Sequence, residues 1–546
     1  MPRPLATPKN HTITSVPAPI GGLNARDSIA NMDPTDAVAL ENWIPDSYGV
    51  RCRKGFVEWA INFPAGKEVQ SILSWFGPAT TFPSGSYLIN PTSLPGKVFA
   101  ATPDGLYDIT SPTNVPVITQ ALSGSTYAGW FSSSMLTNVA GSFLLAASED
   151  DGYFYYDGAV WSKPTMGGGA GQISGVDPAD LCFVLNWKRR VWFVEKDTTR
   201  AWYLATDAIT GTASSFDFGS LFPHGGKLAY LASWTIDAGE GIDDFFVAVS
   251  SNGDVLIYKG TDPASATAFG IVGAYYVGQI PEGRRAFCQY GGDLIIVSTD
   301  GVVPVSMITR GGAGLLVASN KEYSTKIRPL IGSDLRASFT MRGWDAFLHP
   351  SERLLIVGVP DYSETVSSQY AMSTSQNQWC NFSGIPAYSY GNVGGYTLTG
   401  TRDGRVLLLF SSFFDNVPYG ASAGDGIRGV IQPAFSAFGT PALEKQFLMI
   451  RPVMLSADTP SVSIDVNVNY QVNSPAGTLS FSTDTGSLWD TAFWDTAVWG
   501  GSLKTFSEWA SVSGIGFAGA ASILTTTLAD SVLASIDYCV MSGGPL

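Results

Sequence analysis

A short apolar hairpin recurs along this chain and limits what it can fold into. In its clearest copy, the run Leu294-Ile295-Ile296-Val297 precedes Asp300-Gly301, and apolar residues resume at Val302. Asp-Gly between two such runs is a strong local signal for a tight hairpin, because both residues tolerate the positive φ that the turn needs. Four more copies turn at Asp104-Gly105, Asp151-Gly152, Asn252-Gly253 and Asp403-Gly404, and two weaker ones at Asp197-Thr198 and Asp361-Tyr362.

The spacing of these turns predicts the architecture. Successive turns lie 42 to 61 residues apart, a range that overlaps the repeat of ~40 to 50 residues that propeller blades show. The sequence therefore predicts an all-β fold with a β-propeller of six or seven blades over residues 61–440. Ordinary hairpins in stacked sandwiches are the alternative interpretation. The longest interval, from 300 to 361, predicts an insertion or a long loop.

The composition agrees with an all-β chain and constrains its partners. Charged residues make up 14% of the 546 residues, and the formal net charge is −15. Nucleic-acid binding depends on neutralising phosphates, so this charge disfavours a protein that grips DNA. The mean hydropathy of +0.13 is high for a chain without a membrane span, and we expect other subunits to cover part of the surface.

Residues with chemistry to offer are few. The five cysteines lack a C-x-x-C spacing, which predicts reduced, buried thiols rather than a disulfide framework or a zinc site. Gly420–Gly424 matches G-x-S-x-G, but no histidine follows His349, so the motif predicts a loop. We therefore expect no enzyme, no cofactor, and no catalytic or metal-binding residue.

One acidic segment has two possible interpretations. Asp237, Glu240, Asp243 and Asp244 lie close together and would suit a hard cation. Their spacing matches no known loop, and turn chemistry at strand ends is the alternative. Residues 509–529 carry no charge, but their Gly, Ser and Thr content favours strands over a membrane span.

Residues 1–60 are predicted to form an N-terminal arm, a short helix and a strand. Asp33-Pro34 resembles a helix N-cap followed by proline at the first helical position. Ala37, Leu40 and Trp43 would share one face of a helix over residues 34–43. A strand is expected over residues 49–53.

Residues 441–546 are predicted to form a separate antiparallel β-domain. The apolar and polar residues of 462–470 alternate, as in a strand with one buried face. Tryptophans spaced five apart suit neither a strand face nor a helix stripe, and tryptophan is a common interface anchor. The candidate interface residues are Trp43, Trp489, Trp494 and Trp499, with local packing as the alternative.

The N-terminal stretch also resembles a known family. Gly21-Gly22-Leu23-Asn24, Met32–Ala37, Asn42-Trp43-Ile44-Pro45 and residues 49–55 are similar to the N-terminal signature of tail proteins from short-tailed bacteriophages. That group includes the tail nozzle, also called tail tubular protein B, and the head-closure or packaged-DNA stabilisation proteins. Residues 225–263 and the Trp-Asp repeats resemble later parts of the same proteins. These residues do not separate the nozzle from the closure protein.

The resemblance implies a structural protein of the virion tail. Its members form a hexameric ring below the portal and adaptor, contact tail fibres or spikes, and retain and then conduct DNA without sequence-specific binding. The alternative is a carbohydrate-binding or glycan-cleaving propeller, which would carry acids, arginine and aromatics in a central pocket and act as a monomer. A propeller scaffold for protein partners is a third possibility.

Overall fold

Two compact units make up the chain. The computed structural model describes residues 11–64, 67–81, 91–237, 242–310, 322–360, 368–475, 477–481 and 503–543. The propeller unit comprises residues 57–369 and 384–411, and the terminal unit comprises residues 1–56, 370–383 and 412–546. Among the described residues, no helix has the length and apolar character needed to cross a membrane.

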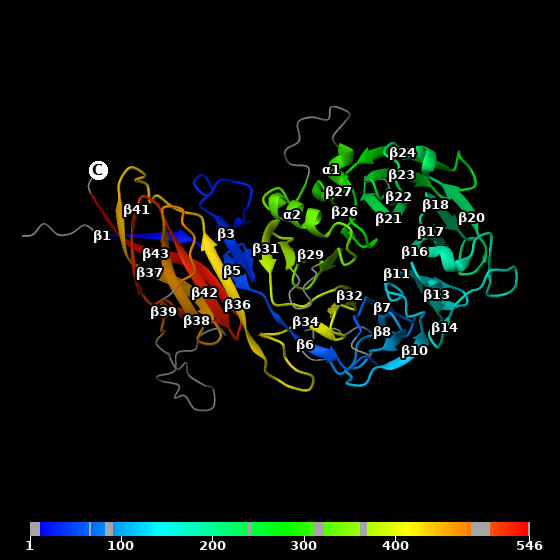
Figure 1. Ribbon diagram of the computed structural model, residues 1–546, viewed down its shortest axis with the longest axis horizontal. Coiled ribbons are helices and arrows are strands. Elements are labelled where there is room, and N and C mark those ends of the chain that lie inside the picture. The colour runs from blue at the N-terminus through cyan, green and yellow to red at the C-terminus, as the bar shows by residue number, and fades with distance from the viewer. Residues whose placement is uncertain are drawn as a thin grey trace, which may run out of the picture. The chain divides into compact units, whose positions relative to one another are not determined.

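Six small antiparallel sheets build the propeller unit (Figure 1). The first has β7 (Ser71–Trp75), β8 (Lys97–Thr102), β9 (Gly105–Asp108) and β10 (Val117–Ala121). The second has β11 (Phe131–Asn138), β12 (Gly141–Ser148), β13 (Gly152–Tyr156) and β14 (Trp161–Ser162). The third has β16 (Leu181–Trp187), β17 (Arg190–Glu195), β18 (Arg200–Tyr203) and β20 (Ser214–Asp217).

The remaining sheets follow in chain order. The fourth has β21 (Leu228–Asp237), β22 (Ile242–Ser250), β23 (Asp254–Gly260) and β24 (Phe269–Tyr276), and the fifth has β25 (Phe287–Tyr290), β26 (Asp293–Ser298) and β27 (Gly301–Pro304). The hairpin of β28 (Asp345–His349) and β29 (Leu354–Val359) comes next. The sixth sheet has β32 (Ser389–Val393), β33 (Tyr396–Gly400), β34 (Val406–Ser412) and, from the other end of the chain, β6 (Gly55–Ala60).

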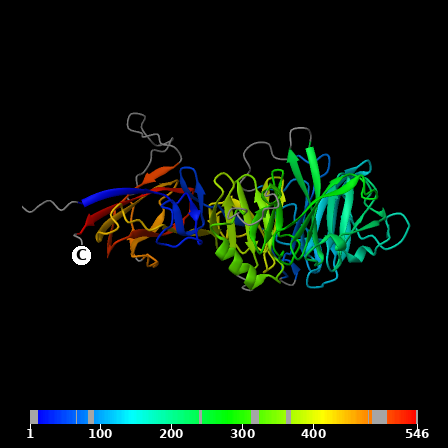
Figure 2. The ribbon, with the colours of Figure 1, turned by 90° about the horizontal axis from the view of Figure 1, so that it is seen from above.

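These elements close into a ring. Strands of successive sheets contact one another in the order β7, β11, β16, β21, β26, and then β25, β28, β32 and again β7. Viewed at right angles to Figure 1, the strands of this unit run side by side (Figure 2). The predicted β-propeller is therefore confirmed, with six separate sheets and the β28–β29 hairpin at a seventh position.

Short elements connect the sheets. β15 (Ile173–Ser174) pairs with β19 (Gly211–Thr212), and the 3-10 turns η2 (Pro178–Asp180) and η3 (Gly219–Leu221) flank the third sheet. The insertion predicted between residues 300 and 361 is confirmed, because α1 (Val305–Arg310) and α2 (Arg328–Ser338) lie there.

Six of the seven predicted turns join the second and third strands of a sheet, and Asp361-Tyr362 lies outside the described residues. The expected geometry, with two positive φ values, is wrong. Gly152, Gly253, Gly301 and Gly404 have positive φ, but the Asp or Asn before each does not. Side-chain bonds hold these turns instead: Thr102 Oγ1 donates to Asp104 at 2.5 Å, and Asp300 N–H donates to Ser298 Oγ at 3.2 Å.

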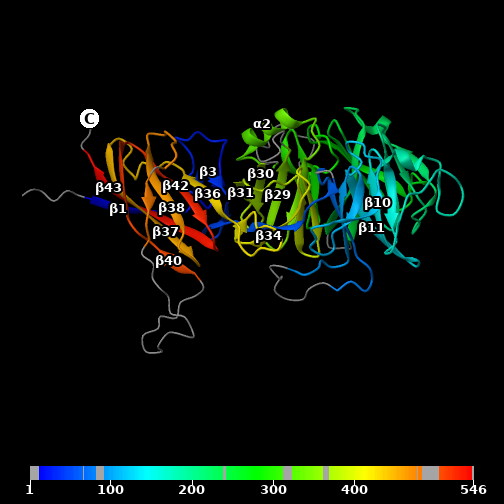
Figure 3. The ribbon, with the colours of Figure 1, turned by 60° about the horizontal axis from the view of Figure 1, so that its bottom comes forward.

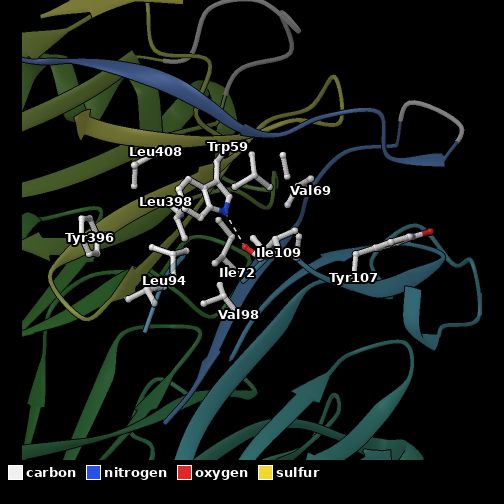
Figure 4. Close-up of a cluster of buried hydrophobic side chains, with 14 of the residues drawn as sticks. Trp59, Val69, Ile72, Leu94, Val98, Tyr107, Ile109, Tyr396, Leu398 and Leu408 are labelled. Atoms are coloured by element: carbon white, nitrogen blue, oxygen red, sulfur yellow. Dashed lines mark hydrogen bonds between the residues drawn. The ribbon is translucent and has the colours of Figure 1, made fainter. Parts of the chain in front are cut away.

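A buried cluster closes the ring between its first and last sheets (Figure 4). Trp59 of β6 packs with Val98 of β8 and Leu408 of β34, and each is at most 3% exposed. Trp59 Nε1 donates to the carbonyl of Ile109, just beyond β9, at 2.7 Å. An N-terminal strand thus joins the C-terminal sheet and binds the first one, so both ends of the propeller sequence are held together.

Two packed sheets form the terminal unit. One contains β4 (Trp43–Asp46), β5 (Gly49–Cys52), β43 (Ser531–Ser542), β37 (Lys445–Ser456) and β40 (Lys504–Phe506), with β1 (His11–Pro17) on β43 and β41 (Ala510–Gly516) on β37. The other runs through β31 (Gln378–Phe382), β3 (Asp36–Glu41), β36 (Asp425–Pro433), β42 (Gly519–Thr527), β38 (Ser461–Val468) and β39 (Thr478–Leu479). β2 (Gly22–Leu23), β30 (Ser368–Ser373) and β35 (Phe414–Asp415) extend this second sheet.

The terminal unit differs from the predicted domains 1–60, 61–440 and 441–546. The antiparallel C-terminal strands are present, and β38 alternates as expected over most of its length. However, residues 1–56 and 412–440 cluster with these strands rather than forming an arm or part of the propeller. β1 lies along β43 over its whole length, from His11 opposite Met541 to Pro17 opposite Ser535 (Figure 3).

The predicted helix over residues 34–43 is wrong, whereas the strand at 49–53 is confirmed as β5. Asp33 does accept the Thr35 N–H at 2.9 Å, but it caps a single turn that leads into β3. A register shift between Ala37 and Ala39 accompanies the pairing of β3 with β36. Such a bulge changes the parity of a strand, so Ala37 and Leu40 are both buried at a spacing that otherwise indicates a helix.

We expect the Trp59→Ala variant to weaken ring closure by about 3–5 kcal/mol, the usual result of removing a buried tryptophan. Trp59→Phe, which keeps most of the volume but loses the bond to Ile109, is the matched control and should lose about 1–2 kcal/mol. Hydrogen exchange of β6 and β34 measures the effect locally. Unchanged protection of β34 in the alanine variant would contradict this account.

Candidate functional site

Three charged residues of the propeller unit, Arg284, Arg285 and Asp345, line a small cavity. The cavity has a volume of about 190 Å³, and its lining comes from several of the strands that face the ring's centre. The lining residues are Ile72, Leu73, Phe131, Ser132, Ser133, Phe183, Arg284, Arg285, Phe287, Asp345 and Tyr390. Ligand pockets usually measure about 300–1,000 Å³, so this one is small.

Arg284, just before β25, links three sheets. Its Nη1 donates to the carbonyls of Leu228 at 2.9 Å and Ala229 at 2.5 Å, the first two residues of β21. Its Nε donates to Glu149 Oε1 at 2.9 Å, beyond the end of β12. Arg342 pairs with the other carboxylate oxygen of Glu149. Burial raises the pKa of Glu149, but the two guanidinium groups outweigh burial and hold that pKa below its usual value.

Arg285 makes a second link, to the first and second sheets. Its Nη1 donates to the carbonyl of Gln70 at 2.8 Å, and its Nη2 donates to Ser71 Oγ and, at 2.6 Å, to the carbonyl of Phe131. The guanidinium also lies 3.9 Å from the ring centre of Trp130. The fifth sheet is thereby bound to the first and second, and the donors of Arg285 face protein acceptors instead of a free ligand site.

The backbone at this position is unusual for its residue type. Arg284 has a φ of 59°, and Gly283 before it has a φ of 116°. A non-glycine residue in the left-handed region costs on the order of 1–3 kcal/mol and persists where its surroundings stabilise it. The bonds of the two arginine side chains are that stabilisation. We call Gly283, Arg284 and Arg285 the axial tether.

Asp345, at the start of β28, is the acidic group of the cavity. Burial raises its pKa to about 7, against the opposing effects of the Arg285 charge and of the backbone N–H groups of Tyr390 and Ala346. Burial likewise lowers the pKa of Arg285 to about 10. The hydroxyl of Tyr390 is buried without a hydrogen-bond partner. The cavity thus combines an acid, an arginine and aromatic rings.

A second buried charge pair lies in the terminal unit, on the stretch that resembles phage tail proteins. The Arg53 side chain is fully buried, and it binds both oxygens of Asp415 at 2.7 Å. Its Nε donates to Asn42 Oδ1 at 2.7 Å, and its Nη2 donates to the Ser383 carbonyl at 2.8 Å. We call these four residues the Arg53 cluster; it joins β4 and β5 to two segments more than 300 positions away.

The start of the same stretch contains a second polar network. Asn24 donates to Asp36 at 2.7 Å and to Asp27 at 2.8 Å, and both Asn24 and Asp36 are 1% exposed. Asn24 and Asp36 belong to the motif that carries the family resemblance, as do Asn42 and Arg53 of the Arg53 cluster. These four polar residues of the motif therefore have an internal, structural role in this chain.

The candidate interface residues have different outcomes. Trp43 is fully buried and donates to Thr525 Oγ1 at 3.2 Å, so it packs inside the terminal unit, as the local-packing alternative predicts. Gly429 makes room for it, since a Cβ there would lie 2.2 Å from Trp43 Nε1. Trp489, Trp494 and Trp499 lie outside the described residues.

The other expected sites show little chemistry. Asp244 accepts a bond from Thr235, and Glu240 lies outside the described residues. No group of three metal-ligating side chains occurs in the part of the chain that the structure describes. All five cysteines are free; four are buried, as expected, whereas Cys539 is half-buried. Sequence reasoning missed the axial tether, because its partners are mostly backbone carbonyls of distant strands.

Comparisons with known proteins give no family. No protein-family description and no curated protein matches the chain. Among solved structures, Sqt1 of Saccharomyces cerevisiae matches at 12% identity with a TM-score of 0.36, covering 65% of this chain and 99% of that one. The computationally designed Ika8 protein matches at 10% identity and 0.34, covering 64% and 99%. The fold assignment therefore rests on the strand pairing described above.

Asp345 gives a pH-dependent prediction. An unfolded aspartate titrates near 3.9, so the folded state holds this proton more tightly. The contribution of Asp345 to stability is therefore complete below about pH 4 and is lost as the pH rises to about 7. The Asn side chain of Asp345→Asn cannot ionise. Between pH 4 and pH 8 we therefore expect the free energy of unfolding of this variant to rise by about 2–4 kcal/mol relative to that of the wild type.

Denaturant unfolding of both proteins at pH 4, 6 and 8 measures this difference. Asp262→Asn, at an exposed turn, is the control for losing one carboxylate. Parallel pH profiles for the wild type and Asp345→Asn would show that Asp345 has no such role.

The Arg53 cluster gives a second prediction. Arg53→Met leaves Asp415 buried without its cation, and we expect a loss of about 3–5 kcal/mol in the terminal unit. The double variant Arg53→Met/Asp415→Leu should recover at least half of that loss, because both charges are removed. Arg26→Met breaks an exposed pair with Asp27 and should cost less than about 1 kcal/mol. The free energy of unfolding, followed by hydrogen exchange, is compared for all three variants. A double variant that is no more stable than Arg53→Met would refute the coupling.

Proposed function

We propose that this protein is a structural subunit of the tail of a short-tailed phage, the tail nozzle. Copies of the chain form a ring below the portal and adaptor, and the ring's channel retains packaged DNA and conducts it during ejection. One observation carries the proposal: the stretch that resembles phage tail proteins supplies the buried Arg53 cluster and the Asn24 network. The residues that carry the resemblance are thus buried residues that connect strands of the terminal unit.

The propeller unit supports a mechanical role. Within one chain, the circle of propeller sheets is closed by the pairing of β6 with β34, and the axial tether binds sheets across its centre. Such links oppose opening of the ring under load. A channel that holds DNA under pressure needs subunits that deform little, and these links between sheets support such a role.

The charge of the chain supports a passive contact with DNA. At −15, each subunit repels phosphate. DNA can move past such a surface without the counterion release that makes basic surfaces bind tightly. We therefore expect no sequence-specific binding and no strong affinity for duplex DNA.

The glycan-binding alternative has one observation in its favour. The central cavity contains the acid, arginine and aromatic residues that such a site uses. Against it, the cavity is small, and Arg284 and Arg285 donate to protein acceptors. Binding of an oligosaccharide that is lost in Asp345→Asn would favour this alternative over the nozzle.

A deletion of the gene in the phage that encodes it tests the proposal. We expect heads that package DNA but lose it, because the exit is not sealed, and electron microscopy with a labelled antibody should place the wild-type protein at the tail vertex. A plasmid copy of the gene should restore infectivity, and the Arg53→Met copy should restore it less well. Particles that lack the protein, or deletion particles that eject DNA normally, would overturn the proposal.

A further inference from the structure

Two uncharged strand edges face solvent on the propeller unit. β10 is the last strand of the first sheet, and β24 is the last strand of the fourth. Residues 109–148, which include β10, contain no Asp, Glu, Lys or Arg, and neither do residues 263–281, which include β24. Edge strands of monomeric proteins usually carry charges that prevent association. These two edges lack that protection.

Both edges also expose large apolar side chains. Val115, Val117 and Ile118 are 69%, 65% and 48% exposed, and we call them the β10 patch. Ile271, Val272 and Tyr276 are 48%, 54% and 48% exposed, and we call them the β24 patch. Apolar residues grouped in this way mark contact surfaces more often than isolated ones do.

The form of the strands indicates the kind of contact. β10 has a register shift between Ile118 and Gln120, and β24 has one opposite Ile257 and Tyr258. Bulges interrupt the row of hydrogen-bonding groups at an edge and hinder the addition of another strand. Side-chain packing is therefore the kind of contact that these two edges favour.

The net charge of the chain indicates which partner the two patches would bind. Two copies of a chain with a net charge of −15 repel each other unless their contact surfaces are neutral. A basic partner would instead bind where the acidic residues lie. Both patches lie within charge-free stretches, so each suits a second copy of this chain better than a basic protein.

We propose that the β10 patch of one copy binds the β24 patch of the next, an inference that rests on the proposed ring for its purpose. The patches differ in sequence and lie on sheets separated by the second and third sheets, so each copy can contact two neighbours. Such head-to-tail contacts between unlike surfaces produce rings when the rotation closes. The two uncharged edges are thereby the two halves of one repeated subunit interface.

Two charged variants of the full chain test the pairing. Val117→Lys alters only the β10 patch, and Val272→Glu alters only the β24 patch. Each variant alone should fall from the wild-type ring to monomers at micromolar concentration, measured by native mass spectrometry and sedimentation velocity. Mixed in equal amounts, the two should restore rings with an even number of subunits, because lysine meets glutamate at one contact and unaltered patches meet at the next.

Val139→Lys and Val139→Glu are the matched controls, since Val139 is fully exposed in the turn between β11 and β12. Both should assemble like the wild type. Restoration in the mixture shows that the two patch variants are folded, and circular dichroism checks each one alone. Charged variants that still form rings, a folded pair that fails to complement, or a wild type that stays monomeric would overturn the pairing. The gene-deletion test of the proposed function is independent of these outcomes.

Discussion

The structure of the propeller unit depends on one closure, in which β6 from the N-terminal side of the propeller sequence joins β34 from its end. Each sheet buries its faces on its two neighbours, so a ring with one open junction would expose two apolar faces at once. The cluster around Trp59 covers both, because it contains residues of the first and the last sheet. Folding of the ring therefore requires contacts between segments almost 350 residues apart, such as the ion pair of Arg405 with Glu58. Long-range contacts of this kind form late and make the closed state cooperative.

The centre of the ring is stabilised in a different way. Strands that converge on an axis leave backbone carbonyls pointing at one another, and a buried acceptor without a donor is costly. The axial tether supplies donors to four of these carbonyls, those of Gln70, Phe131, Leu228 and Ala229. The left-handed φ of Arg284 is the local cost of that arrangement. The position where a propeller could bind a ligand is consequently used to hold its sheets together.

The sequence predicted the parts of the fold that depend on local pattern. Alternation and Asp-Gly turns determine hairpins within about 15 residues, and their spacing determined the propeller. The prediction from sequence failed where one local pattern is compatible with two kinds of secondary structure. The bulge in β3 gives the buried residues Ala37 and Leu40 a spacing that is also typical of a helix. The prediction also failed where partners are distant. The chain has two pairs of adjacent arginines, Arg189-Arg190 and Arg284-Arg285. Arg189 forms an exposed ion pair with Asp207, whereas Arg284 and Arg285 belong to the axial tether. Only their tertiary contacts distinguish the two pairs.

The distribution of charge connects these features to assembly. Soluble monomers place their charges outside, cover their sheet edges with them, and rarely bury arginine. This chain buries Arg53 and Arg284 and half-buries Arg285 as internal links, and it leaves β10 and β24 without charged residues. The internal links connect strands within one copy, and the uncharged edges fit the proposed contact between strongly acidic copies. A subunit that assembles after folding requires both properties, whereas a monomeric binding protein has no need of the second.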